Sequence, residues 1–355
     1  MNDFTSIPAA LSEKDLIGRD GARYFAEEGL IAATQVALTI GRPLLLTGEP
    51  GCGKTDYAFA AAHALRAALG TEDAPSDPLS YYVRSDTTAR DLLYRYDVAR
   101  RFGDAQTGDE TDRARARFPQ NYITLEALGA GLVAPQPRVV LIDEIDKAPR
   151  DLPNDLLREI DQGWFEISEI PQDREQPNDP NIEADKKHLR REMRPAGSHR
   201  PLIVITSNVE RQLPEAFLRR CVFFYIPFPD EERLSDIITS RATQGDPPNS
   251  NADRASAAAK PNTTEDPLGT AAITVFMHLR TQYKLAKKPA TAELIDWVTA
   301  LRKVFGTEAA LPKLAQAAGA INPQSGEGLI DWKEVPGLNC LIKLREDLRT
   351  LSLVS

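Results

Sequence analysis

A glycine-rich segment near residue 50 has the residue types and the spacing of a phosphate-binding loop. It fills every defined position of the pattern G-x-x-x-x-G-K-[ST] and reads Gly48-Glu49-Pro50-Gly51-Cys52-Gly53-Lys54-Thr55. Glycines let the backbone curl around phosphate groups without Cβ clashes, and the backbone N–H groups then face the anion. We expect Lys54 to reach the β- and γ-phosphates and Thr55 to bind Mg²⁺. These residues, with Asp56 directly after them, predict a site for a nucleoside triphosphate and Mg²⁺.

An apolar run further along the chain ends in two carboxylates and reads Val139-Val140-Leu141-Ile142-Asp143-Glu144. A buried strand of this kind delivers its last side chains to the carboxyl edge of a parallel sheet, where ligands bind. We expect Asp143 at the Mg²⁺ site, outside the direct ligands of the ion, and Glu144 as the general base that polarises an attacking water. Apolar runs that end in Asp-Glu are common, so the phosphate loop earlier in the chain is what favours catalysis over a plain strand end.

Two later clusters combine polar side chains with predicted strands, and they read Ile205-Thr206-Ser207-Asn208 and Leu213-Pro214-Glu215-Ala216-Phe217-Leu218-Arg219-Arg220-Cys221. Asn208 could hold the attacking water or a γ-phosphate oxygen, although asparagine also often forms turns. The second cluster predicts a short helix that ends in Arg219 and Arg220. An arginine there either stabilises the negative C-terminal end of the helix dipole or acts as an arginine finger on the nucleotide of a neighbouring subunit.

The elements that must position these residues alternate between short apolar runs and helical patterns. A helix is expected over Ala22–Ile40 and another from Lys54 to about Leu69. Five short apolar runs indicate strands, at Pro43–Thr47, Ser80–Val83, Arg138–Ile142, Leu202–Thr206 and Val222–Ile226. Since helical patterns lie between most of them, the sequence predicts an α/β fold with a parallel sheet covered on both faces.

Changes in composition predict the domain boundaries. Residues 1–240 are expected to form the α/β domain, with polar, charged insertions near residues 95–125 and 166–200. Residues 241–268 are of low complexity and predict a linker. Residues 269–355 are expected to form a small helical domain, in which the predicted helices are Ala271–Leu285, Thr291–Val304, Glu308–Ala318 and Leu338–Leu351.

The composition narrows the class of protein. The chain has 355 residues, 42% of them hydrophobic, which is enough for a packed core. Its net charge of −9 argues against broad binding to nucleic acid, which needs a positive field. The three cysteines, Cys52, Cys221 and Cys340, are spaced neither for a disulfide framework nor for a metal site. With no signal-like start and no apolar run of membrane-spanning length, we expect a cytoplasmic protein without a membrane segment.

The order of these motifs resembles the AAA+ superfamily of ATPases and is most similar to its MoxR branch, including the CoxD-like members. The resemblance covers roughly Leu16 to Phe305. Segments Gly48–Thr55, Val139–Glu144, Ile205–Asn208 and Leu213–Arg220 carry it, and Arg84–Leu93, Tyr96-Asp97 and Pro289–Trp297 support it. The resemblance implies an ATPase with a five-stranded parallel sheet, a C-terminal α-helical lid and a nucleotide-dependent homo-oligomeric ring, usually a hexamer.

Family membership also gives the insertions and several residues an implied role. The two insertions look like the helix-2 insertion and the pre-sensor β-hairpin, which in relatives line the central pore side. MoxR-type proteins resemble chaperones that remodel or activate partner proteins, often ones with von Willebrand factor A domains. Arg220 aligns with the arginine finger of relatives, with Arg219 as its rival. A basic second sensor is implied near Pro289, where the sequence offers only Lys287 and Lys288 just before it.

Other classes of protein also use a phosphate loop. A small-molecule kinase would not need a catalytic glutamate after Asp143, and a GTP switch would need an Asn-Lys-x-Asp motif, which the sequence lacks. A nucleotide-binding scaffold without turnover is disfavoured by Glu144. The main alternative is a nucleic-acid-associated motor or loader, because basic residues cluster in both insertions. These are Arg113, Arg115 and Arg117 in the first and Lys186, Lys187, Arg190, Arg191 and Arg194 in the second. Interleaved acidic residues favour solvated charge instead.

Overall fold

The computed structural model describes residues 15–19, 23–70, 77–172, 179–195, 197, 199–208, 212–242, 266–322 and 328–353. The chain divides into two compact units. The first includes Ala26–Gly48 and Lys54–Ile226, and the second includes Ile17–Phe25, Glu49–Gly53 and the chain from Pro227 onward. The boundary therefore passes twice through the phosphate loop.

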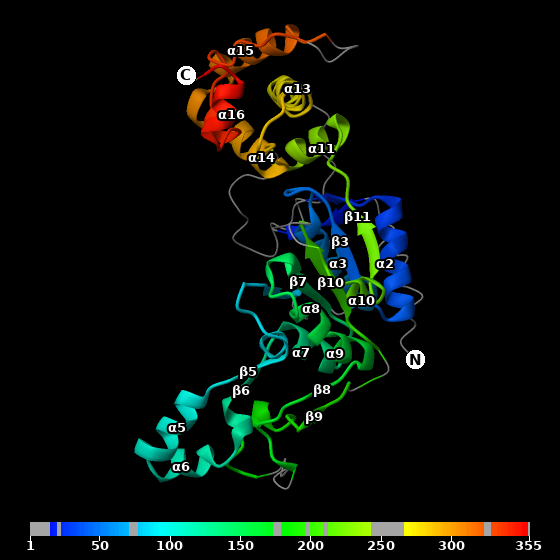
Figure 1. Ribbon diagram of the computed structural model, residues 1–355, viewed down its shortest axis with the longest axis vertical. Coiled ribbons are helices and arrows are strands. Elements are labelled where there is room, and N and C mark those ends of the chain that lie inside the picture. Colours follow the sequence, from blue (N-terminus) through cyan, green and yellow to red (C-terminus); the bar gives the residue numbers. More distant parts are fainter. Residues whose placement is uncertain are drawn as a thin grey trace. The chain divides into compact units, whose positions relative to one another are not determined.

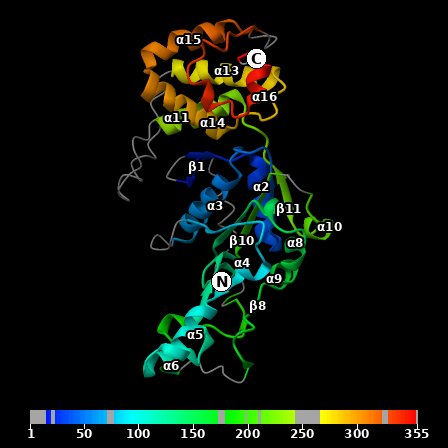
Figure 2. The same ribbon diagram turned by 60° about the vertical axis from the view of Figure 1, so that its left-hand side comes forward.

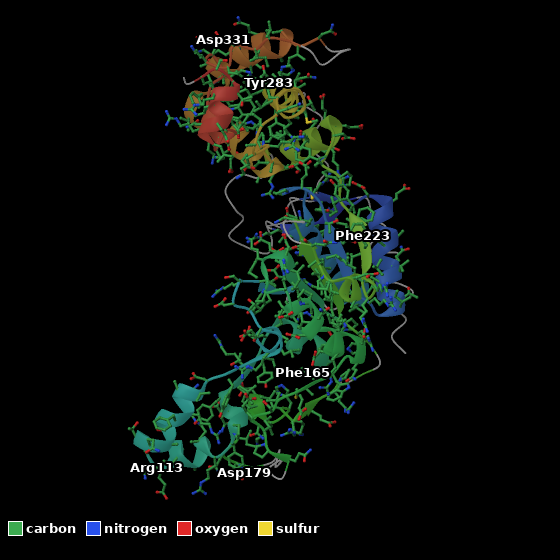
Figure 3. All side chains as sticks on the ribbon, viewed as in Figure 1. Arg113, Phe165, Asp179, Phe223, Tyr283 and Asp331 are labelled. Atoms are coloured by element: carbon green, nitrogen blue, oxygen red, sulfur yellow. The ribbon has the colours of Figure 1, made fainter. Side chains whose placement is uncertain are left out.

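A five-stranded parallel sheet organises the first unit (Figure 1). Its strand order is β11-β3-β10-β7-β4, which confirms the predicted α/β fold. The strands are β3 (Leu44–Thr47), β4 (Leu79–Tyr82), β7 (Val139–Asp143), β10 (Leu202–Ser207) and β11 (Val222–Tyr225). The three central strands are buried along their whole length, as expected for strands covered on both faces. At the edge, β11 exposes Phe223, labelled in Figure 3, and Tyr225.

Helices cover the two faces of the sheet. On one face α2 (Glu28–Ile40) contacts β11 and β3, and α3 (Lys54–Leu69) contacts β7 and β10. Thr34 and Tyr57 join these two helices through a hydrogen bond of 2.5 Å between their hydroxyl oxygens. The other face packs into a core with α7 (Ala127–Val133), which contacts β4 and β7. Shorter helices complete the unit, at α4 (Ala89–Leu93), α8 (Leu152–Asp155), α9 (Leu157–Gln162) and α10 (Glu215–Leu218).

The first predicted helix starts later than expected. The sequence predicted a helix over Ala22–Ile40, but Arg23–Phe25 is strand β2, in a two-stranded sheet with β1 (Asp15–Ile17). Helix α2 begins at Glu28, after Glu27 in an extended conformation with φ −74° and ψ 146°. Aromatic residues favour extended backbone, so this preference outweighed the helical spacing at the start of the segment.

Two segments leave the sheet between its strands. We call residues 94–125 the helical arm. It consists of β5 (Tyr94–Tyr96), α5 (Val98–Thr107), α6 (Glu110–Ala116), the 3₁₀ turn Pro119–Tyr122 and β6 (Ile123–Leu125). The sequence predicted a polar, charged insertion near residues 95–125. The side chains of Asp97 and Asp109 cap α5 and α6 by accepting backbone N–H groups, which explains two helices in so polar a stretch.

We call residues 165–193 the hairpin segment. It pairs β8 (Phe165–Glu166) with β9 (Glu192–Met193) and contains a 3₁₀ turn, Ala184–Lys186. Leu189 and Met193 are buried in the same core as the sheet. The labels of Arg113 and Asp179 in Figure 3 mark the helical arm and the hairpin segment.

From Glu231 onward the described part of the second unit is mainly helical, in agreement with the predicted helical C-terminal region (Figure 2). It contains α11 (Glu231–Ala242), α13 (Pro267–Gln282), α14 (Thr291–Ala300), a π-helix (Leu301–Phe305), α15 (Thr307–Gly319), a 3₁₀ turn (Leu338–Cys340) and α16 (Arg345–Thr350). The predicted helix Leu338–Leu351 is thus broken, since Leu344 is extended at φ −117° and ψ 141°. Most of the predicted linker lies outside the described residues. No described helix is long and apolar enough to cross a membrane.

Candidate functional site

Three of the predicted motifs follow three neighbouring strands. The phosphate loop follows β3, Asp143 and Glu144 end β7, and Asn208 follows β10, which lies between the other two. The strand register aligns their ends, because Thr47 pairs with Ser207 and Ile142 pairs with Ile205. The fold therefore delivers the polar side chains of all three motifs to the carboxyl edge of the sheet.

Lys54 and Thr55 begin helix α3 at this edge. The Lys54 side chain is buried and its Nζ donates a hydrogen bond to the carbonyl oxygen of Gly48 at 2.9 Å. The Thr55 hydroxyl lies 3.0 Å and 3.2 Å from the two carboxylate oxygens of Asp143. The hydroxyl of Thr206 donates to Asp143 Oδ1 at 2.5 Å. Asp143 is thus held by hydroxyl groups from α3 and β10. Asp56 is half-buried in the first turn of α3.

The oxygen donors at Thr55 and Asp143 fit Mg²⁺ in kind and in number. Mg²⁺ takes oxygen ligands, keeps several waters, and usually binds through one or two protein oxygens together with phosphates of the substrate. Among the described residues no group of three or more histidine, cysteine or acidic side chains could enclose a metal ion. The two oxygen-bearing side chains match what Mg²⁺ takes from a protein when waters and substrate phosphates supply its other ligands.

Glu144 has a backbone conformation that is rare for its residue type. Its φ of 60° and ψ of 51° lie in the left-handed region, which costs about 1–3 kcal/mol for a residue other than glycine. A hydrogen bond of 2.9 Å from its backbone N–H to the Thr206 hydroxyl holds this conformation. Its carboxylate contacts Lys147 Nζ at 2.6 Å and accepts from Asn208 Nδ2 at 3.3 Å. Strain of this kind is typical of functional sites.

Two residues that sequence reasoning missed, Asp146 and Lys147, contact Asn208 and Glu144. The carboxylate of Asp146 is buried and accepts the backbone N–H of Asn208 at 3.2 Å and 3.3 Å, which fixes the residue after β10. Lys147 places its ammonium 2.6 Å from the Glu144 carboxylate, so that side chain contacts both Lys147 and Asn208. Both lie within three residues of Glu144, so the pattern Asp-Glu-x-Asp-Lys was the available signal.

The tip of the phosphate loop, Glu49–Gly53, belongs to the second unit. Gly51 has φ 76°, and a Cβ there would lie 2.7 Å from the Cβ of Ala290, so only glycine fits. Gly53 has φ 92° and approaches the ring of Tyr24.

Cys52 is buried and its backbone N–H donates to the Glu49 carbonyl at 3.3 Å, while Pro50 is exposed. Arg280 of α13 donates a hydrogen bond to the Glu49 carboxylate at 2.5 Å.

Arg219 and Arg220 are not brought to the carboxyl edge. Both precede β11, whose first residue, Val222, pairs with Leu44 at the start of β3, so they lie at the amino edge of the sheet. Arg220 forms an ion pair with Asp161 at 2.7 Å and its side chain is 38% exposed. Arg219 is 74% exposed and pairs with Glu215. Neither arginine therefore belongs to the cluster of Lys54, Thr55, Asp143, Glu144 and Asn208 in its own chain.

The lysines considered as second sensors are exposed, and Lys287 pairs with Glu293 at 3.9 Å. Arg280, which sequence reasoning missed, contacts the phosphate loop through Glu49. Glu49 and Arg280 lie 231 positions apart, so no local pattern could signal their pairing.

Comparison with solved structures finds proteins of low identity to this chain. The FIGL-1 AAA domain in complex with ADP is 17% identical, with a TM-score of 0.36 and coverage of 92% of this chain and 86% of that one. C. elegans PCH-2 is 15% identical, with a TM-score of 0.36 and coverage of 77% and 60%. NtrX from Brucella abortus in complex with ATP is 14% identical, with a TM-score of 0.38 and coverage of 86% and 53%. The chain thus spans less than two thirds of the latter two proteins.

A search of the curated proteins finds no match to this chain. The model of a protein family described as "AAA domain (dynein-related subfamily)" matches residues 43–243. That span contains the phosphate loop, the carboxylates after β7, Asn208 and both arginines, and it exceeds half of the 355 residues. The chain therefore belongs to the AAA domain family, in its dynein-related subfamily.

Proposed function

We propose that this protein is an ATP-hydrolysing motor of the MoxR type, which remodels or activates partner proteins as a nucleotide-dependent ring. The observation that carries the proposal is the convergence of Thr55, Asp143, Glu144 and Asn208 at one edge of the sheet. A binding loop alone would not need a glutamate in a strained conformation beside an asparagine amide. That pair is the arrangement which hydrolysis requires in addition to binding.

Each residue of the cluster has a distinct role in the proposal. Lys54 leaves the carbonyl of Gly48 and contacts the β- and γ-phosphates, and the N–H groups of the loop surround them. Thr55 would hold Mg²⁺ with the Asp143 carboxylate beside it, and the bound ion would supply positive charge near the phosphate oxygens. Glu144 takes a proton from the attacking water, and Asn208 orients that water or a γ-phosphate oxygen.

The position of the two arginines supports action on a neighbouring subunit. Arg220 lies at the opposite edge of the sheet from the cluster of its own chain. A guanidinium there contributes nothing to its own active site, but across a ring interface it can stabilise charge on the γ-phosphate. The exposed ion pair with Asp161 costs little to break, so Arg220 is available for this role. Arg219 remains its rival, and the ring is proposed to be a hexamer.

The partner is proposed to be a protein, with von Willebrand factor A domains as the leading class, because of the MoxR-like motifs. Basic side chains in and directly after the hairpin segment have acidic or carbonyl partners, which argues against nucleic acid. Arg191 pairs with Glu166 at 2.5 Å, Arg194 pairs with Glu192 at 2.8 Å, and Arg190 donates to the carbonyl oxygens of Lys187 and Leu189. The neighbouring carboxylates lower the net positive charge that binding to a phosphate backbone needs.

Nucleotide binding by the full-length Lys54→Ala variant tests the core of the proposal. Because this change removes the charge that contacts the β- and γ-phosphates, a fluorescent ATP analogue with Mg²⁺ should no longer bind tightly. The matched control is Lys313→Ala, whose ammonium lies in the second unit and pairs with Glu334 at 3.5 Å. The control should bind as the parent does. Equal binding by parent and Lys54→Ala would refute the assigned loop.

Ring formation needs its own measurement. Light scattering of the parent with and without ATP should show an ATP-dependent increase in mass. A protein that remains monomeric at every ATP concentration and still hydrolyses ATP at full rate would contradict the ring motor while leaving the ATPase intact.

A further inference from the structure

Arg280 is a buried arginine that contacts the phosphate loop from helix α13. Its side chain is only 7% exposed and its guanidinium lies 3.5 Å from the ring centre of Phe228. One nitrogen, Nη2, donates to the Glu49 carboxylate at 2.5 Å, and the other, Nη1, donates to the carbonyl oxygen of Pro289. Glu49, Arg280, Pro289 and Phe228 all belong to the second unit.

The two hydrogen bonds of Arg280 flank a tight approach between backbones. Pro289 precedes Ala290 and Thr291, and these residues lie against Gly51 so closely that no Cβ fits there. Glu49 lies two residues before Gly51 on the other side of this contact. A single planar guanidinium thus fixes both the loop tip and the turn that begins α14. A lysine offers no such fork of donors.

The charge of Glu49 makes this pairing relevant to nucleotide binding. Its side chain is 41% exposed, and its carboxylate accepts a hydrogen bond from the guanidinium of Arg280. An ionised carboxylate in a loop that surrounds a triphosphate repels that ligand, whose charge has the same sign. The guanidinium of Arg280 compensates the carboxylate, and Glu49 in turn compensates a buried cation that would be costly alone.

We propose that Arg280 is a positioning residue for nucleotide binding, which neutralises Glu49 and ties the tip of the phosphate loop to the C-terminal helices. The inference rests on the proposed function and adds to it a lid cation that acts through the loop. Arg280 does not need to touch the nucleotide. It sets the charge and shape of the loop that does.

A double-mutant cycle in the full-length protein tests the inference, with the Kd of a fluorescent ATP analogue and the steady-state kcat as readouts. Arg280→Gln removes the guanidinium from the Glu49 carboxylate, so the Kd should rise about 10-fold, within the usual range for coupled sites. In Arg280→Gln/Glu49→Gln the repelling charge is also gone, so most of that loss should be recovered. At saturating ATP, kcat should change little, because Glu144 and Asn208 are untouched.

Salt provides a second readout that a packing defect would not move. Raising NaCl from about 0.05 M to about 0.5 M should bring the Kd of Arg280→Gln closer to the Kd of the parent, since salt screens an exposed charge. The matched control is Arg302→Gln, which breaks another ion pair of the same unit, 2.5 Å long, with Asp266. This control should lower the melting temperature without changing the Kd.

Additive effects in the cycle, or a Kd for Arg280→Gln equal to that of the parent, would overturn the inference. If Arg280→Gln does not fold, the cycle is run with Arg280→Lys, which keeps the charge but cannot join Glu49 to Pro289. Non-additivity with Glu49→Gln is again expected, and additivity again overturns it. Lys54→Ala is measured in parallel. A parent that does not bind the analogue refutes the proposed function, whereas a binding parent with an additive cycle refutes only this inference.

Discussion

The carboxyl edge of the sheet and the contact between the helical arm and the hairpin segment are both dense networks of polar side chains, but they differ in how the chain encodes them. At the sheet edge, each residue of the cluster lies at the end of a strand or in the loop and helix start that follow it, so neighbouring strands bring them together. In the arm, Asn121 donates to the carbonyl oxygens of Arg115 at 3.0 Å and Asn181 at 2.9 Å, and accepts the N–H of Glu183 at 2.9 Å.

Arg115 strengthens this second network through charge. Its guanidinium pairs with Asp104 at 2.9 Å within the arm and with Glu183 of the hairpin segment at 3.1 Å. Hydrogen bonds to Asp104 and Tyr122 raise the pKa of Arg115 further above its usual value. The comparison teaches that the first network carries backbone strain at Glu144, whereas the second holds two segments of the chain together. Changes in the first should alter turnover, and changes in the second should alter local stability.

The largest effect is expected from Arg220→Ala, a change that lies outside both networks. Loss of a finger that acts on the neighbouring subunit should lower ATP turnover by about 10³–10⁵-fold and leave ATP affinity nearly unchanged. Turnover and nucleotide binding are measured on the same preparation, with Arg219→Ala as the matched variant. Mixing Arg220→Ala with Lys54→Ala should restore part of the activity, because some interfaces of a mixed ring combine an intact loop with an intact arginine. Mixed assemblies without activity would contradict action across the interface.

Glu144→Gln tests the sheet edge directly. It keeps the size and the hydrogen bond to Asn208 but removes the general base, so turnover should fall by about 10²–10⁴-fold while ATP still binds. Steady-state phosphate release measures this, and filter binding should show that ATP-bound protein accumulates. Thermal unfolding should be nearly unchanged. Unchanged hydrolysis would assign the base to another residue.

Asn121→Ala tests the other side of the comparison. Asn121 is buried and loses three hydrogen bonds, which should destabilise the arm by about 1–3 kcal/mol. Hydrogen exchange should increase in the helical arm and in the hairpin segment together, while the basal ATPase rate stays the same. Asn154→Ala, at an exposed site on α8, is the matched control and should change neither. Exchange that increases in the arm alone would show that Asn121 does not join the two segments.

The smallest effect concerns acid. Hydrogen bonds from Tyr122 and Arg115 hold the pKa of Asp104 below its ordinary value of 3.8. A carboxyl whose pKa is depressed on folding stabilises the folded state above its unfolded pKa, and this contribution is lost as the pH falls through the folded pKa. The melting temperature of the parent should therefore exceed that of Asp104→Asn near pH 6, and the difference should shrink below about pH 4. A constant difference would exclude titration of Asp104.

The sequence predicted the parallel sheet and the polar side chains at its carboxyl edge, because both depend on local patterns. Five apolar runs gave the strands, and the motifs that follow them gave the cluster around Asp143. The same reasoning failed where tertiary contacts decide. Leu338–Leu351 has helical spacing, but the chain breaks near Leu344. Periodicity cannot show such a break, because the apolar residues still reach the core from a bent chain.

Arg280 and Asn121 could not be predicted for a different reason. Their partners lie 231 and 60 positions away, and neither residue stands in a recognisable motif. Asp146 is an intermediate case, because it is close to Glu144 but its role depends on the backbone after β10. Residues whose function is to hold other residues have few constraints on their local sequence.

The surroundings of Trp164 should make its fluorescence sensitive to an anionic quencher. The chain has three tryptophans. Trp297 and Trp332 are buried among the C-terminal helices, whereas the half-buried ring of Trp164 lies 5.2 Å from the guanidinium of Arg158 and 4.4 Å from that of Arg194. An anionic quencher such as iodide is drawn to these two cations and reaches only this indole. Fluorescence that iodide removes therefore reports on the base of the hairpin segment, and the emission that remains reports on the helical unit.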